Sequence, residues 1–116
     1  MIKFYHNPRC SKSRQGLEIL KNASLDFETI EYLKNPLSKK EIKEIIDYLN
    51  IDAIDLIRTS ESDWKEHFKG KNLREDEIIS AMVEFPKLIE RPIVISNQKG
   101  VIGRPPENIA LFLKNI

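Results

Sequence analysis

The sequence predicts an α/β protein with a mixed sheet, and three stretches of its 116 residues lead to that class. Residues 2–32 form a strand-helix-strand pattern, and residues 38–85 are dominated by amphipathic helices. Residues 93–116 form two short strands and a closing helix. The predicted order is therefore β-α-β, a helical insertion, and then β-β-α.

The amino-terminal stretch gives the β-α-β opening. Residues 2–5 (Ile-Lys-Phe-Tyr) are a short apolar run that ends before Asn7-Pro8, as a strand entering a loop does. Residues 11–22 carry Leu17 and Leu20 at helical spacing, and residues 25–32 alternate in part like a strand. The two strands should be parallel, with a right-handed crossover between them.

The middle of the chain is helical. Ser38 and Glu41 form a capping-box signature, followed by an apolar face at Ile42, Ile45, Ile46 and Leu49. A second helix is predicted from Arg74 to Phe85, because Pro86 ends it. Residues 52–73 mix short helical turns with polar loop.

The carboxyl-terminal stretch returns to strands. Residues 93–95 are β-branched, residues 97–100 are predicted as a turn, and residues 101–102 resume the strand, which together indicate an antiparallel hairpin. Pro105-Pro106 opens a last helix whose predicted apolar face is Ile109, Phe112, Leu113 and Ile116. This is the arrangement of a thioredoxin-like fold. We predict one domain over residues 1–116, with a core of 1–33 and 87–116 and an insertion at 34–86.

Composition excludes several function classes. The chain has 19 basic and 18 acidic residues and a net charge of +1, with no basic stripe, so no nucleic-acid partner is expected. No apolar run approaches the roughly 20 residues that span a bilayer, and the amino terminus lacks a secretory signal. One cysteine cannot form an internal disulfide. We expect a cytoplasmic monomer with no membrane partner.

Cys10 is the residue most suited to chemistry. A lone cysteine is usually a small buried hydrophobe. Here it follows a strand and starts a helix, where free N–H groups and the helix dipole favour an anion. Arg9, Lys12 and Arg14 add positive charge nearby. We therefore predict that Cys10 is a nucleophilic thiolate.

Two neighbours of Cys10 are candidates for tuning its ionisation. Ser13 occupies the second-cysteine position of a Cys-x-x-Cys motif, and its hydroxyl is predicted to donate a hydrogen bond to the thiolate. His6 is predicted to help to set the thiol's protonation. No metal site is expected, because Cys10, His6 and His67 do not have ligand spacing.

Three arginines are candidates for binding an anion. Arg58 ends an apolar segment, Arg91 precedes the hairpin, and Arg104 follows it. A hairpin brings its two ends together, so Arg91 and Arg104 are predicted to share one site, and a guanidinium suits a tetrahedral oxyanion. Pro92 stands where thioredoxin-like domains hold a cis proline beside the active cysteine.

These segments together resemble the glutaredoxin-coupled arsenate reductases, the ArsC family, over nearly the whole chain. The similarity rests on residues 5–14 (YHNPRCSKSR), 56–58 (LIR), 90–94 (ERPIV) and 103–105 (GRP). The resemblance implies that Cys10 is the nucleophile, that His6 and Ser13 assist it, and that Arg58, Arg91 and Arg104 bind arsenate and arsenite. It further implies glutathione as co-substrate, glutaredoxin as partner and no tightly bound cofactor.

Two alternatives share the fold. Spx-type regulators bind RNA polymerase, but their redox-sensing members carry the Cys-x-x-Cys that this chain lacks, and they generally lack the third arginine, here Arg104. A glutathione-dependent thiol reductase without physiological arsenate activity is the nearer alternative. Arg104 argues against it as well.

Overall fold

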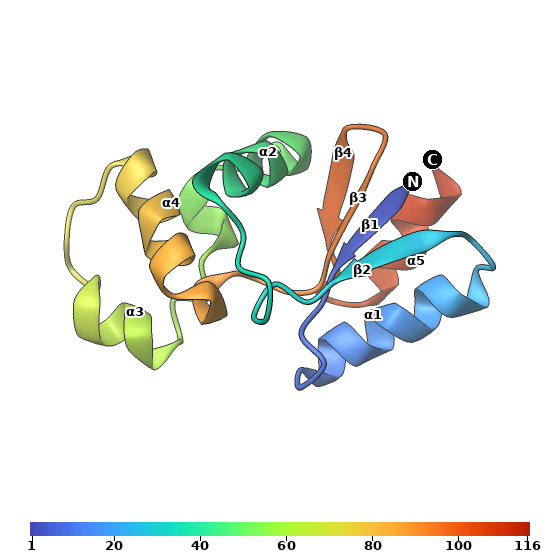
Figure 1. Ribbon diagram of the computed structural model, residues 1–116, viewed down its shortest axis with the longest axis horizontal. Coiled ribbons are helices and arrows are strands. Elements are labelled where there is room, and N and C mark those ends of the chain that lie inside the picture. Colours follow the sequence, from blue (N-terminus) through green and yellow to red (C-terminus); the bar gives the residue numbers. More distant parts are fainter. The chain divides into compact units, whose positions relative to one another are not determined.

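The computed structural model describes all 116 residues, and the chain divides into two compact units (Figure 1). One unit combines residues 1–35 with 91–116, and the other is residues 36–90. The first unit contains the whole sheet, and the second contains only helical elements.

The sheet of the first unit is mixed, as predicted. Its strands run in the order β2-β1-β3-β4, with β1 parallel to β2 and antiparallel to β3, and with β3 antiparallel to β4. Their bounds are β1 (Ile2–Tyr5), β2 (Phe27–Ile30), β3 (Ile93–Ser96) and β4 (Lys99–Ile102).

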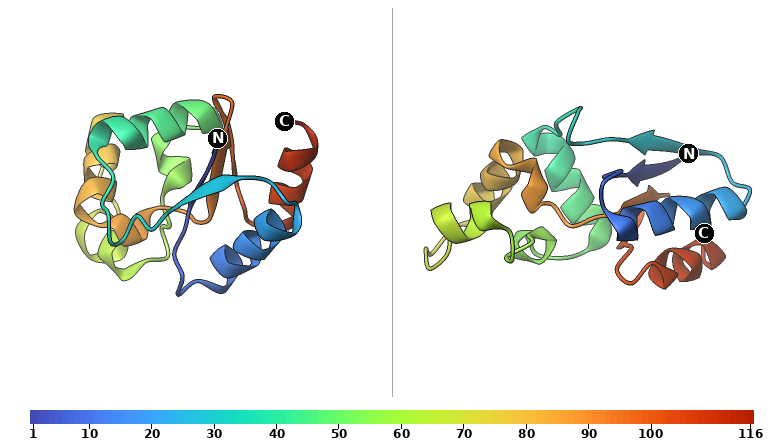
Figure 2. Two further views of the ribbon diagram at one scale, coloured as in Figure 1. Left: turned by 45° about the vertical axis from the view of Figure 1, so that its right-hand side comes forward. Right: turned by 90° about the horizontal axis from the view of Figure 1, so that it is seen from below.

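Two helices, α1 (Ser11–Asn22) and α5 (Glu107–Lys114), lie on the same face of this sheet and contact each other (Figure 2). Side chains from both helices and from the two central strands form one apolar cluster, whose buried members are Ile2, Phe4, Leu20, Val94 and Ile109. This β-α-β and β-β-α arrangement is the thioredoxin-like fold. The predicted fold class is confirmed.

Three details differ from the prediction. The second strand is shorter than residues 25–32, because Ser24 has a left-handed φ of 57° and Leu25 is exposed. The hairpin turn consists of Asn97 and Gln98 alone, both with positive φ, so Lys99 already belongs to β4. Two such residues match the twist of the flanking strands. Ile116 lies beyond the end of α5 and is exposed, not part of the buried face.

The second unit is built from helical segments. Ser38 and Glu41 form the predicted capping box, with both hydrogen bonds at 3.1 Å. Its elements are α2 (Lys39–Leu49), η1 (Ala53–Leu56), α3 (Ser62–His67), α4 (Glu75–Glu84) and η2 (Pro86–Leu88). Helix α4 contacts α2, η1 and η2. No helix of the chain combines the length and apolar character needed to cross a membrane.

Candidate active site

The loop before α1 holds Cys10 at the N-cap of that helix. The Asn7 side-chain oxygen accepts from the Arg9 N–H at 3.0 Å, and the Asn7 carbonyl accepts from the Cys10 N–H at 3.0 Å. The Arg14 guanidinium donates to the Pro8 carbonyl at 3.0 Å. Asn7 therefore fixes the turn from which the thiol projects. Sequence reasoning used Asn7 only as a loop marker, although Asn-Pro before a helix start is a turn signal.

The Cys10 thiol is half-buried and is poised to ionise. Burial is the largest single influence and opposes the charge, but three groups together outweigh it and lower the pKa of the thiol. These are the backbone N–H of Ser13, the Arg91 side chain through both hydrogen bonding and charge, and the backbone N–H of Lys12. The predicted contributions of the Arg9, Lys12 and Arg14 charges are absent from this set. The cation that favours the thiolate is Arg91, which is distant in the sequence.

Ser13 is fully buried and joins His6 to the loop. Its hydroxyl and His6 Nδ1 share a hydrogen bond of 2.7 Å, and the same oxygen accepts from the Asn7 N–H at 3.0 Å. The predicted donation from this hydroxyl to the sulfur stays a prediction. The backbone N–H of Ser13 is among the groups that lower the pKa of the Cys10 thiol.

His6 is buried and stacks on Phe4, with ring centroids 5.2 Å apart. Burial lowers the pKa of His6; the charge of Glu31 partly offsets this, and the charge of Arg14 adds to it. A neutral imidazole is the form that results at neutral pH. Through its hydrogen bond with Ser13, the imidazole ring helps to hold the start of the helix that carries the thiol.

The hairpin of β3 and β4 brings Arg91 and Arg104 together at its open end. Ile93 pairs with Ile102, and the Gly103 N–H donates to the Pro92 carbonyl at 2.8 Å. Both the Arg91–Pro92 and the Arg104–Pro105 peptide bonds are cis. The Pro92 ring lies close to Gly16 of α1 and to Gly103, where a Cβ would come within 3.0 Å and 2.9 Å of it. Pro92 is thus packed between the cysteine helix and the hairpin.

Arg104 has hydrogen-bonding capacity that the protein does not use. Its Nη1 is buried and has no hydrogen-bond partner. A buried guanidinium nitrogen without a partner costs free energy unless a ligand or water accepts from it. Because Arg91 interacts with the Cys10 sulfur and Arg104 stands across the hairpin from Arg91, this end of the sheet combines a thiol of lowered pKa with a spare cationic donor.

Arg58 belongs to the second unit, where it pairs with two carboxylates. Its Nη1 donates to Glu61 at 2.8 Å, and its Nε lies 3.3 Å from Glu90. Neither glutamate was singled out from the sequence. Glu90 is far from Arg58 along the chain, and only the pairing of residues 56–58 with 88–90 brings the two together.

Comparison with known proteins places these residues in a family. The ArsC family model matches residues 5–112. This chain belongs to the ArsC family. It is 43% identical over 110 residues to the Escherichia coli protein YfgD, described as uncharacterized, covering 93% of this chain and 92% of that one. It is 40% identical to an arsenate reductase of Neisseria meningitidis, covering 97% of both chains. A putative arsenate reductase from Yersinia pestis has the same fold with a TM-score of 0.91 and 40% identity, over 96% of this chain and 99% of that one.

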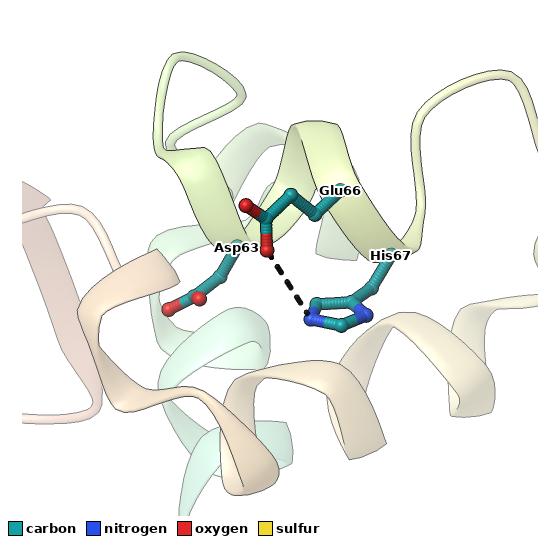
Figure 3. Close-up of side chains that lie close together, drawn as sticks. All are labelled: Asp63, Glu66 and His67. Atoms are coloured by element: carbon teal, nitrogen blue, oxygen red, sulfur yellow. Dashed lines mark ion pairs between the residues drawn. The ribbon is translucent and has the colours of Figure 1, made fainter.

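One further cluster of this ArsC-family chain lies in the second unit. Asp63, Glu66 and His67 place possible ligand atoms within 4.8 Å of one another, and Glu66 pairs with His67 at 3.8 Å (Figure 3). The His67 ring stacks on Phe85 at 5.1 Å, which accounts for its orientation. Glu66 and His67 are exposed, and such groups commonly gather on protein surfaces without a cation. We assign no metal to them.

Proposed function

We propose that this protein reduces arsenate to arsenite, with Cys10 as the nucleophile and glutathione and glutaredoxin as the electron donors. One observation carries the proposal: the Cys10 thiolate is favoured by Arg91, and Arg104 holds an unused buried donor across the same hairpin. Relatives named arsenate reductases, 40% and 39% identical to this chain over nearly their whole length, support the choice of substrate.

The arginines make the first step electrostatically feasible. A thiolate that approaches an oxyanion is repelled unless cations neutralise both, and preorganised guanidinium groups do so while they orient the ligand. We assign this role to Arg91 and Arg104. The family resemblance adds Arg58. His6 and Ser13 hold the loop, and Pro92 packs between helix α1 and the hairpin.

The proposed reaction balances with external thiols. The Cys10 thiolate attacks arsenic(V), and one arsenate oxygen leaves as water after protonation. The glutathione thiolate then attacks the Cys10 sulfur, so that a Cys10–glutathione disulfide forms and the two electrons of the sulfur–arsenic bond stay on arsenic, which leaves as arsenite. A glutaredoxin thiol takes glutathione from Cys10 and restores the thiolate. These donors belong to a reducing compartment, so we propose that the protein works in the cytoplasm, as a monomer.

Arsenite formation tests the proposal. Purified protein with arsenate, glutathione and glutaredoxin should form arsenite, and Cys10→Ser should abolish it. Arg104→Ala should lower kcat/KM by about a hundredfold or more, because a preorganised donor to the oxyanion is lost. Arg74→Ala removes an exposed arginine of the second unit and should leave kcat/KM unchanged.

Two results would overturn this function. No cysteine-dependent arsenite, together with glutathione-dependent reduction of a mixed disulfide, would identify a thiol reductase instead. Capture of the RNA polymerase α subunit by a protein that forms no arsenite would identify an Spx-type regulator.

A further inference from the structure

Arg58 lies between two carboxylates in the second unit. Glu61 accepts from Nη1 at 2.8 Å, and Glu90 lies 3.3 Å from Nε. All three side chains are only 20–23% exposed, so solvent screens their charges less than it screens those of a surface pair. Two carboxylates on one guanidinium are an unusual setting for an arginine that is expected to bind an anion.

The backbone enforces the pairing with Glu90. Ile57 and Ile89 form an antiparallel bridge, the Arg58 N–H donates to the Leu88 carbonyl at 2.7 Å, and the Glu90 N–H donates to the Leu56 carbonyl at 2.8 Å. In this register Arg58 and Glu90 are diagonal neighbours on one face, within reach of long side chains. The contact follows from the fold of the segment.

The remaining donors of Arg58 define where an anion would bind. Nε and Nη1 face the two glutamates, so Nη2 is the nitrogen through which Arg58 would bind a ligand. A guanidinium is a planar fork, and its Nε–H and Nη2–H bonds run parallel, so that acceptors on the two nitrogens sit side by side. A ligand oxygen on Nη2 would therefore lie next to the Glu90 carboxylate oxygen.

Two neighbouring anionic oxygens repel each other unless a proton lies between them. We propose that Glu90 is a specificity-determining residue, which makes Arg58 select oxyanions that carry a proton, such as hydrogen arsenate or hydrogen phosphate, against sulfate, which carries none. A protonated oxyanion donates its O–H to Glu90 in a charge-assisted hydrogen bond. Sulfate offers only acceptors and is repelled. This inference rests on the proposed binding of an oxyanion by Arg58.

Replacing the carboxylate by an amide tests the charge and retains the shape. Binding of inorganic phosphate and of sulfate to the full-length protein is measured by calorimetry at pH 7 and constant ionic strength. Neither anion is a substrate for reduction, so turnover does not interfere. Wild-type protein should bind phosphate more tightly than sulfate. Glu90→Gln should strengthen sulfate binding by about tenfold, as expected for removing one charge about 6 Å from a dianion in water.

Phosphate binding should change less in Glu90→Gln, because the loss of the charge-assisted hydrogen bond offsets the relief of repulsion. The ratio of sulfate to phosphate dissociation constants should therefore fall by at least about threefold. Glu44→Gln makes the same change of charge at an exposed position of α2 and should leave the ratio unchanged. Arg58→Ala should weaken the binding of both phosphate and sulfate.

An unchanged ratio in Glu90→Gln would overturn the inference. So would equal affinities in Arg58→Ala and wild type, or no binding of either anion. Arsenite formation separates this question from the proposed reaction. If the protein forms arsenite but Glu90→Gln has no effect on the ratio, only the proposed role of Glu90 is refuted. If the ratio changes as predicted but no arsenite forms, the role of Glu90 stands and the proposed reaction is refuted.

Discussion

Replacing Gly103 by alanine tests whether close packing at the end of the hairpin positions the arginine that favours the thiolate. A Cβ at this position would lie 2.6 Å from Ile109 Cδ1, 2.9 Å from Ile109 Cγ1 and 2.9 Å from Pro92 Cγ. Ile109 is fully buried in the apolar cluster, and Pro92 follows Arg91 directly. Neither neighbour can move without disturbing the core or the arginine.

The expected cost is that of overpacking a well-packed core, about 1–3 kcal/mol in the free energy of unfolding. For a domain of this size, the midpoint of thermal unfolding should fall by about 4 °C or more. Because Arg91 is displaced with Pro92, the pKa of Cys10 should rise toward that of an ordinary thiol. Denaturant titration measures the stability, and the rate of Cys10 alkylation against pH measures the ionisation.

Ile109→Val provides the matched control, because it removes Cδ1, the atom nearest to the new Cβ. By itself it should cost about 0.5–1.5 kcal/mol. Combined with Gly103→Ala it should cost less than the sum of the two single changes, since both act on one contact. Additive costs, or a Gly103→Ala protein with unchanged stability and unchanged alkylation, would refute the packing argument.

Two further predictions concern titration. In wild type, alkylation of Cys10 should have its pH midpoint below that of free cysteine, and Arg91→Gln should move it upward because the hydrogen bond and charge that favour the thiolate are lost; an unmoved midpoint would remove Arg91 from this role. Burial lowers the pKa of His6, so the unfolded chain binds a proton first as the pH falls. The free energy of unfolding should therefore be highest above about pH 6.5 and decrease below it. His6→Asn should lessen this decrease, and an equal slope in both proteins would contradict the assignment.

Most helices and strands were predicted from the sequence, because the capping residues and apolar spacing that define each one lie within a few residues of one another. The capping box at Ser38 and Glu41 uses groups three residues apart, and it fixed the start of α2 correctly. The β-branched run at 93–95 placed the hairpin, and a hairpin necessarily brings Arg91 and Arg104 to the same end. The extent of the turn was not predictable, because left-handed backbone at Gln98 follows from the twist of the strands and not from residue type.

The candidate site was predicted as a set of residues but not as a set of contacts. The charges nearest to Cys10 in sequence are Arg9, Lys12 and Arg14, yet the cation that favours its thiolate is Arg91. The Ser13 hydroxyl forms hydrogen bonds with His6 and Asn7, neither of which was expected from the sequence. Both outcomes depend on which polar groups share a buried space.

The sequence by itself predicted Cys10 as the nucleophile, its place at a helix start and a need for external thiols, because these predictions use one cysteine and a local pattern; the structure confirms the place at the helix start. The tertiary structure decided which groups set the chemistry of that cysteine and of Arg58. The pairing of strands in the sheet brings Arg91 to the Cys10 sulfur. The bridge between Ile57 and Ile89 brings Glu90 to Arg58. Electrostatic interactions act through space, and only folding brings such groups within a few ångströms of one another.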